Sequence, residues 1–573
     1  MTNSTKPLPC PRCGNDTLRP NGTRTNAAGE ERINYTCRET SGDRKYCYST
    51  LDPTKPYRDT VRRPKKDEDV RKKFRRKLRN SKYVIFTAAQ NSTPTHMGFF
   101  RGSLEALAQD YGADKAVIPL RYKNPTSMFS DSQRNAEHWL RDVAELELAE
   151  QGITIDNCHE KLPHDPRPWE HILDDQAAHH LYEQRKKLND NLVVVGDVKT
   201  QPTRDDPLTS MEGFTHGESG IFGHTKQRMK CVATPQGEMP KILTTTGACT
   251  LKNYTDTPTG KKGEFHHILG AVLVEIESSK KFHLHHINAT RDGTFIFRRK
   301  MYHPDGTVTD APRDKAMIFG DAHYRFADPK VVEATFGEGG LVEEHDPDVL
   351  IWHDLLDCYF GNPHHKDNPF IAKAKHSAGF HIAENEVRET VAWLEKLTGD
   401  RLSYVVPSNH DDMFARWVIR EDWKKIDPDN MEFYLETALQ MAKSAKMSEV
   451  GAEYLDPFCY WVTKFTGDHP RIVPMHVNEP LKIGDIECGY HGDKGPNGAR
   501  GTIKNLSKIG VKVISGHGHS PAIQDGHYRV GTMTALKAEY VNGPNNWLNA
   551  HASIDALGKR HMHFCIDGKF YSE

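Results

Sequence analysis

The sequence predicts a mixed α/β protein that folds into several domains. With 573 residues the chain is too long for one ordinary hydrophobic core, so two or three domains are expected. Between residues 83 and 310, strand-like apolar runs alternate with helix-like patterns, which is typical of a parallel α/β sheet. From residue 311 onward, five short apolar runs each end at polar residues of the kinds that bind metals.

These patterns divide the chain into four parts: a zinc-ribbon-like module (1–60), a basic linker or helix (61–82), an α/β accessory domain (83–310) and a C-terminal domain (311–573). Overall charge is balanced, with 77 Lys and Arg against 78 Asp and Glu, so only local clusters of charge can indicate a partner. No apolar run approaches the roughly 18 residues that span a bilayer, and the first residues lack the pattern of a signal peptide. We therefore expect a cytoplasmic protein with no membrane partner.

Four cysteines cluster before residue 50. Cys10 and Cys13 form a C-x2-C pair followed by glycine, a geometry in which two thiolates wrap one zinc ion. Cys37 and Cys47 are separated by nine residues, where a second zinc pair normally has far fewer. The cluster predicts one structural Zn²⁺ held by all four residues, and the alternative is four unrelated free thiols.

A strongly basic run occupies residues 62–82, with twelve basic and three acidic residues. Such a run is often a solvated helix or linker. The alternative is contact with nucleic-acid phosphates, which require positive charge but no particular spacing. Its position beside a possible zinc module favours the second interpretation.

The region 83–310 contains the alternating strands and helices. Strands are predicted at 83–90, 116–120 and 191–197, helices at 102–110, 136–151 and 171–188, and long loops over 200–262. No catalytic pattern is evident in this region, so it is a candidate interface for a homo-oligomer.

Three stretches of this region imitate metal sites. The run VVVGD ends at Asp197, but Lys199 stands where a neutral imidazole would be required. The histidines of FHHIL (265–269) and FHLHHIN (282–288) are flanked by apolar residues at strand-like spacing, which predicts edge-strand or interface positions.

The five apolar runs of the C-terminal region lead to a set of candidate ligands. The runs begin near residues 315, 348, 401, 486 and 511. Their ends carry Asp321 and His323; Asp354; Asn409 with His410 and Asp411; His491; and His517 with His519. Because neighbouring parallel strands end at the same edge of a sheet, we expect the five strands to converge on one edge.

This ligand set fits a two-metal hydrolase. Two divalent ions about 3.5–4 Å apart need a bridging carboxylate, further O and N ligands, and open positions for water and a phosphoryl oxygen. Mixed Asp, Asn and His ligands favour Mn²⁺, with Fe²⁺, Zn²⁺ or Mg²⁺ as alternatives.

The motifs resemble those of the calcineurin-like metallophosphoesterase superfamily, in particular its branch of Mre11/SbcD-like nucleases. The family pattern is Asp-x-His, Gly-Asp-x-x-Asp, Gly-Asn-His-Asp/Glu, His and Gly-His-x-His, and it covers about residues 312–573. Two positions depart from it, because His353 and Ser408 stand where the family has glycine. The resemblance implies a β-sandwich flanked by helices as the fold of the C-terminal domain.

The resemblance also implies roles for individual residues. One metal would be held by Asp321, His323, Asp354 and His519; the other by Asp354, Asn409, His491 and His517. His410 would stabilise or protonate the leaving oxygen. Asp411 would orient its imidazole.

A glycine-rich turn, HGDKGPNGARG, follows the fourth run. Lys494 and Arg500 supply cations there, where a phosphodiester would lie, and a simple solvated loop is the alternative. This form of the turn is similar to that of metallophosphoesterases encoded by tailed phages.

The substrate class does not follow from the superfamily, because one site serves nucleases and phosphatases alike. The zinc module, the basic run and the Lys/Arg turn favour DNA. The arrangement is similar to that of pre-early proteins with which large tailed phages degrade host DNA in the host cytoplasm. Two alternatives remain open: a phosphatase or nucleotide phosphodiesterase acting on a small molecule or protein, and a DNA-binding regulator with a vestigial site.

Overall fold

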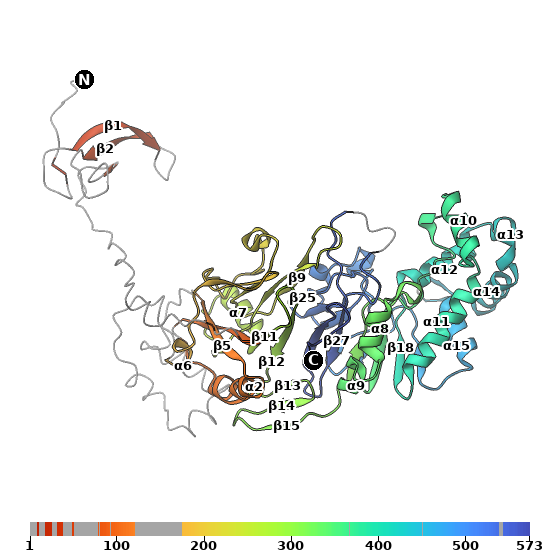
Figure 1. Ribbon diagram of the computed structural model, residues 1–573. Helices are drawn as coiled ribbons and strands as arrows, with labels where there is room; N and C mark the ends of the chain where they lie inside the picture. The colour runs from red at the N-terminus through yellow and green to blue at the C-terminus, as the bar shows by residue number, and fades with distance from the viewer. Residues whose placement is uncertain are drawn as a thin grey trace. The chain divides into compact units, whose positions relative to one another are not determined.

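The fold was analysed in a computed structural model, which describes residues 9–10, 18–25, 31–37, 49–50, 78, 81–91, 93–120, 175–365, 367–449, 451–537 and 543–572 (Figure 1). The chain forms two compact units, Met1–Arg75 and Arg76–Glu573. Three of the sequence-based predictions fall outside the described residues: Cys13 and Cys47 as zinc ligands, most of the basic run over 62–82, and the helix at 136–151.

The first unit contains a small antiparallel sheet of strands β1 (Leu18–Thr25), β2 (Glu31–Cys37) and β3 (Ser49–Thr50). Cys10 and Cys37 are both buried, and Tyr35 packs against them. Two of the four predicted zinc ligands therefore lie in one buried cluster.

A six-stranded sheet forms the centre of the C-terminal region of the second unit. Its strands, in spatial order, are β21 (Ile472–Pro474), β18 (Leu402–Val405), β17 (Val349–Trp352), β16 (Ala316–Ile318), β27 (Ala550–Ile554) and β28 (Arg560–Phe564). The first four are parallel to one another, and the last two are antiparallel. Successive side chains of a strand face opposite ways, so Met317 and Phe319 enter one core while Ala316 and Ile318 enter another.

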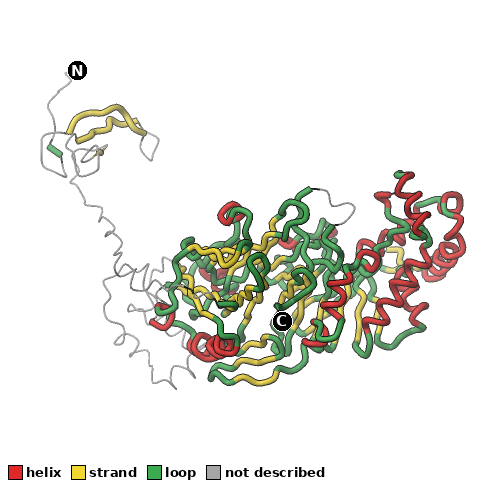
Figure 2. Tube along the Cα trace, in the orientation of Figure 1, coloured by secondary structure: helices red, strands yellow, loops and turns green. Residues whose placement is uncertain are grey.

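Helices cover the first of these two faces and gather at one end of this unit (Figure 2). They are α8 (Pro329–Phe336), α9 (Leu341–His345), α10 (Pro369–Ala378), α11 (Ala383–Thr398), α12 (Asn409–Arg420), α13 (Trp423–Ile426), α14 (Met431–Ser444) and α15 (Pro457–Thr466). Local signals set their ends. In α15, for example, the Asp456 side chain accepts the Cys459 N–H at the start, and Gly467 ends the helix with a left-handed φ of 63°. Phe336 and Trp352 stack at 5.6 Å between centroids, which joins the helical layer to the sheet.

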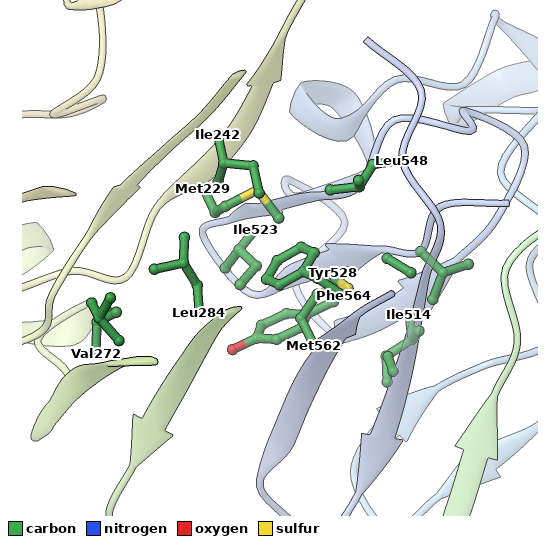
Figure 3. Close-up of a cluster of buried hydrophobic side chains, with 14 of the residues drawn as sticks. Met229, Ile242, Val272, Leu284, Ile514, Ile523, Tyr528, Leu548, Met562 and Phe564 are labelled. Atoms are coloured by element: carbon green, nitrogen blue, oxygen red, sulfur yellow. The ribbon is translucent and has the colours of Figure 1, made fainter. Parts of the chain in front are cut away.

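The opposite face packs against strands of a ten-stranded sheet. Its order is β22 (Lys482–Ile483), β23 (Ile486–Glu487), β24 (Lys512–Ser515), β26 (His527–Arg529), β25 (Ala522–Gln524), β9 (Met229–Val232), β10 (Lys241–Thr245), β8 (Ser219–Phe222), β7 (Leu192–Val195) and β6 (Arg185–Asn189). Figure 3 shows the shared core, where Met229 lies beside Ile523. Because β9 pairs with β25, this sheet continues across the predicted domain boundary at residue 310.

A four-stranded sheet completes the accessory region, in the order β12 (Phe282–Asn288), β11 (Gly270–Ile276), β4 (Tyr83–Gln90) and β5 (Asp114–Leu120). Only β4 and β5 of this sheet are parallel, so the sheet is mixed and not parallel as the sequence predicted. Helices η1 (Gly98–Ser103) and α2 (Leu104–Asp110) and the ribbon β13 (Phe295–Phe297), β14 (Lys300–Tyr302) and β15 (Val308–Asp310) complete this part. A mixed α/β fold is thus confirmed, including the predicted strands at 83–90 and 116–120.

Two further predictions for this region were wrong. The helix expected at 171–188 is described only from residue 175, as a short α6 (Asp175–Ala178) followed by strand β6. The stretch 200–262 contains strands β8, β9 and β10 and the start of α7 (Pro258–Phe265), not only loops. These four- and five-residue strands are too short to give a clear periodicity in the sequence. They pair with one another and, in the case of β9, with the distant strand β25.

Candidate metal centre

All five predicted runs deliver their polar residues to one place, but from two sheets rather than from one edge. The strands β16, β17 and β18 of the six-stranded sheet lead to Asp321, Asp354 and Asn409. The strands β23 and β24 of the ten-stranded sheet lead to His491 and His517. The expected single edge is therefore corrected to the neighbouring ends of two packed sheets.

The first ligand group contains Asp321, His323, Asp354 and His519, whose ligand atoms all lie within 4.8 Å of one another. Nε2 of His519 is 3.1 Å from Oδ2 of Asp321 and 3.1 Å from Nε2 of His323. All four side chains are buried. This is the same set that the sequence motifs assigned to one metal.

The second group shares Asp354 with the first and adds His491 and His517. Nε2 of His491 lies 3.1 Å from Oδ2 of Asp354. Oδ1 of Asn409 lies 3.0 Å from Nε2 of His491 and 2.9 Å from Nδ1 of His517, so it faces the same point. Asp354 thus lies between two groups of ligands, the position a bridging carboxylate occupies.

The chemistry of these groups fits divalent cations. Oδ1 of Asp354 is buried and has no hydrogen-bond donor among the residues that the structure describes. A buried carboxylate oxygen without a donor is costly, and a cation would satisfy it. The groups could hold metal, and the number and kind of ion stay predictions.

The charges of the site keep its carboxylates ionised. Burial raises the pKa of Asp354, but His491 and the neighbouring histidines outweigh burial and hold that pKa well below its ordinary value. Burial likewise raises the pKa of Asp321, and the hydrogen bond from His519 lowers it to about 2. Burial lowers the pKa of His323, but its hydrogen bond to Asp357 and the nearby carboxylates raise it to about 9. A cation entering the site therefore competes with protons on imidazole.

Four of the candidate ligands have strained backbones. His323, Asp354, His517 and His519 have φ values of 41°, 43°, 67° and 49°, in the left-handed region that residues with a Cβ seldom adopt. Such strain clusters at functional sites, because there it fixes the direction of a side chain. Gly516 makes room for another candidate ligand, since a Cβ at this position would overlap Oδ1 of Asp321.

His410 lies beside the first group, with its ring 4.6 Å from that of His323. Its Nδ1 is 2.6 Å from the backbone carbonyl of Asp357, which leaves Nε2 as the atom that can exchange a proton with a ligand. Burial lowers the pKa of His410, ahead of the opposing effect of Asp354.

Asp411 does not orient His410, contrary to the sequence-based expectation. Its Oδ2 accepts the backbone N–H of Ser408, and Ser408 Oγ accepts the N–H groups of His410 and Asp411, which together form a capping box on α12. The reason is geometric, since consecutive residues at a helix start point in different directions. Ser408, which departs from the family pattern, thereby fixes the helix that begins at Asn409.

Asp357 is an acidic residue of the site to which the motifs assigned no role. Its Oδ1 lies 3.2 Å from Nδ1 of His323, and it forms a third candidate group with His323 and His410. The sequence did contain a signal for Asp357, because it is the second Asp of the Asp-x-x-Asp pattern that begins at Asp354. The other departure, His353, is buried with its ring 5.6 Å from that of His491.

The glycine-rich turn starts at His491, so its basic residues are attached to the site. Lys494 and Arg500 face each other across an isolated bridge and are exposed. Nζ of Lys494 lies 3.2 Å from Asp412 Oδ2. Of the two predicted cations, Lys494 is therefore paired with a carboxylate.

The imitations of metal sites lie elsewhere. Asp197 accepts a hydrogen bond from Arg185, and Lys199 pairs with Glu183. The histidines of 282–288 belong to β12, an edge strand as predicted, and are buried. His266 and His267 instead follow the end of helix α7, so an edge-strand position was wrong for them. Among the described residues, none of these stretches contributes to a candidate metal group.

Comparison with known proteins gives one informative similarity. The chain is 27% identical over 510 residues, 86% of its length, to Protein A1 of Escherichia phage T5, of which the alignment covers 84%. No protein-family model matches the chain, and no solved structure matches it. Within the described part of the chain, every helix is too short or too polar to cross a membrane. The similarity to Protein A1 supports a phage protein.

Proposed function

We propose that this protein is a metal-dependent deoxyribonuclease that hydrolyses phosphodiester bonds by a two-metal mechanism. The observation that carries the proposal is the position of Asp354, whose carboxylate takes part in two candidate ligand groups. One group adds Asp321, His323 and His519, and the other adds His491 and His517, with Asn409 beside them. Two adjoining groups that share one carboxylate match the ligand arrangement of a two-metal hydrolase.

Different residues of the protein would have different roles in such a reaction. The two groups would hold divalent cations, most simply Mn²⁺, which polarise a phosphoryl oxygen and activate water when bound. The left-handed backbones of His323, Asp354, His517 and His519 hold those four ligands in place without rearrangement. Nε2 of His410 is then placed to give a proton to the leaving oxygen, because Nδ1 is occupied by the carbonyl of Asp357.

Burial affects the acidity of His410. Because burial lowers its pKa, the neutral imidazole is favoured at neutral pH, and the protonated fraction is a stronger proton donor than an ordinary imidazolium. Asp357, which contacts His323 through its side chain and His410 through its carbonyl, couples the proton donor to the first ligand group.

Three features favour DNA as the substrate. Cys10 and Cys37 are buried together, as two ligands of a structural Zn²⁺ would be. A basic run over residues 62–82 follows the four cysteines in the sequence, and the turn after His491 carries Lys494 and Arg500. Similarity to a phage protein fits degradation of host DNA in the host cytoplasm during infection.

A panel of substrates tests the proposal. With Mn²⁺, the purified protein should cleave linear and circular duplex DNA and, more slowly, a small chromogenic phosphodiester. Asp197→Ala, which removes the carboxylate of the imitation site at an exposed position, is the matched control for the variant Asp354→Ala. Intact DNA together with rapid hydrolysis of a phosphomonoester would replace the nuclease with a phosphatase. Binding of DNA without hydrolysis of any ester would favour a DNA-binding regulator.

A further inference from the structure

A large cavity of the described chain lies outside the candidate metal centre. It has a volume of about 1040 Å³ and none of the candidate metal ligands lines it. Its walls come from the end of α7, the β25–β26 turn and the turn between β27 and β28, together with residues that precede β24. Both the accessory region and the C-terminal region therefore contribute to it, and its size is that of a site for a sizeable ligand.

The lining is strongly basic. Seven lining residues are Lys or Arg, against three Asp or Glu. Two of the cations are paired, Lys226 with Asp525 at 3.5 Å and Lys512 with Asp485 at 2.6 Å. Lys252, Lys508 and Lys559, in contrast, form no ion pair with any residue that the structure describes. These three amines leave a positive charge in the cavity that an anion would neutralise.

Part of this charge is held rigidly. The guanidinium of Arg560 lies 4.3 Å from the ring centroid of Tyr528, and its Nη1 donates to the carbonyl of Val513 at 3.2 Å. Burial lowers the pKa of the neighbouring Lys559, and the nearby Lys512 lowers it further. Cations crowded in this way are destabilising by themselves, and a bound polyanion would relieve the repulsion.

An aromatic ring stands at the same cavity. Phe265, the last residue of α7, is 80% exposed, an unusual exposure for a large apolar side chain. Its ring meets that of His266 edge-on at 5.0 Å. Basic grooves with an exposed aromatic ring are typical of sites for single-stranded nucleic acid, where bases stack on the ring and phosphates face the cations.

The cavity is also close in sequence to the metal centre. His519 is a candidate metal ligand, and Asp525, only six residues later, lines the cavity. A chain of this length spans at most about 22 Å, which a nucleic-acid strand covers with about six nucleotides at roughly 3.4 Å each.

We propose that this cavity binds the backbone phosphates of a nucleic-acid strand whose scissile bond lies at the metal centre. The inference rests on the proposed function, because the strand is the substrate of that centre. Lys252, Lys508 and Lys559 contact the phosphates, and Phe265 stacks on a base.

A charge-reversal variant in an inactive background tests this. In Asp354→Ala, a fluorescent single-stranded 20-mer is bound, and fluorescence anisotropy gives its affinity without cleavage. Adding Lys252→Glu, Lys508→Glu and Lys559→Glu should weaken binding at least tenfold and reduce the slope of log affinity against log salt by about 2, at about 0.7 for each phosphate that is no longer neutralised. Phe265→Ala alone should weaken binding severalfold, because one base then has no ring on which to stack.

The matched control is a triple variant with the same change of charge on exposed lysines of α10, α11 and α14, namely Lys373→Glu, Lys396→Glu and Lys443→Glu. It should bind the strand as the parent does. If the cavity and control variants bind equally well, the inference is overturned. If the cavity variant loses only binding of a mononucleotide such as dAMP, the cavity is a small-nucleotide site and the strand is excluded.

Cleavage assays separate this inference from the proposed function. In the otherwise wild-type protein with Mn²⁺, the cavity variant should hydrolyse a chromogenic phosphodiester at the wild-type rate while its KM for DNA rises. Failure of the wild-type protein to cleave any substrate would contradict the proposed function, but loss of strand binding in the cavity variant would still support the cavity as a nucleic-acid site.

Discussion

Nδ1 of His410 donates a hydrogen bond to the backbone carbonyl of Asp357, with 2.6 Å between the two atoms. This contact fixes the tautomer and the orientation of the imidazole, so that Nε2 is the atom available to a substrate. Asp357 reaches His323 with its side chain at 3.2 Å, so one residue contacts both a candidate metal ligand and the candidate proton donor. Asp411, the neighbour in sequence, instead caps helix α12.

Asp411 caps helix α12 and does not orient the imidazole of His410, which gives a first prediction. His410→Gln should lower kcat for DNA by about 10²–10⁴, the usual contribution of a proton donor, while metal binding is kept. Asp411→Asn should leave kcat within a few fold and lower the free energy of unfolding by about 1 kcal/mol, because it weakens the capping box. Steady-state kinetics and calorimetric metal titration measure both. Equal losses of kcat in the two variants would restore Asp411 as the orienting residue.

Gly516 gives a second prediction. A Cβ at this position would overlap Oδ1 of Asp321 and touch His353, so Gly516→Ala should displace a ligand of the first group. Affinity for Mn²⁺ should fall at least tenfold, as measured by calorimetry. Gly217→Ala is the matched control, because a Cβ there meets nothing within 4 Å. Unchanged metal affinity in Gly516→Ala would show that Asp321 is not held as described.

The buried Glu386 predicts how stability depends on pH. Its carboxyl accepts the N–H groups of Tyr359 and Phe360 at 2.9 and 3.2 Å. Burial, and then the charge of Asp357, raises its pKa from 4.5 to about 7. A raised pKa means that the folded protein keeps the proton while the unfolded chain releases it, so this group's stabilising effect is complete below pH 4.5 and is lost as the pH rises to 7.

The variant Glu386→Gln removes this titration. Its free energy of unfolding relative to that of the wild type should rise between pH 5 and pH 8 by up to about 3 kcal/mol, since one pKa unit corresponds to about 1.4 kcal/mol. Urea unfolding at both pH values measures the difference. Glu384→Gln, on the exposed side of the same helix, should show no such change. Parallel pH profiles of wild type and Glu386→Gln would contradict the assignment.

The cysteine cluster of the first unit gives a prediction about zinc. Cys37→Ser in the full-length protein should lower the zinc content, measured by elemental analysis, by one ion per chain, because Cys10 and Cys37 share a buried cluster. Cys231→Ser is the control, since Cys231 lies on β9 in the second unit. Equal zinc content in both variants and the wild type would favour unrelated thiols.

The residues that form the candidate ligand groups could be located in the sequence because they follow apolar runs. Asp321, Asp354 and His517 follow strands whose apolar patterns are visible in isolation. The sequence could not show that β16 and β24 belong to different sheets, because alternation of side chains is the same in any strand and pairing is decided by distant partners. For the same reason the sequence did not predict strand β9, which pairs with β25 almost three hundred residues later.

The direction in which side chains point was the second feature that the sequence could not predict. The sequence placed Asp411 next to His410, but only the helix start at Asn409 determines that Asp411 turns back to Ser408. The contact of His410 with the carbonyl of Asp357 involves the backbone of another segment, which no motif records. The basic cavity depends likewise on residues from α7, β26 and the β27–β28 turn that share no local pattern.

The most direct test of a two-metal nuclease is metal-dependent DNA cleavage by the metal-stripped protein and by Asp354→Ala. Stripped wild-type protein should leave linear duplex DNA intact, bind two Mn²⁺ per chain at the paired groups, and cleave the DNA as Mn²⁺ is restored. Asp354→Ala should remain folded, no longer bind two Mn²⁺ per chain, and leave the DNA intact at every Mn²⁺ concentration. Cleavage by Asp354→Ala at the wild-type rate, or intact DNA with wild-type protein carrying both ions, would contradict the account.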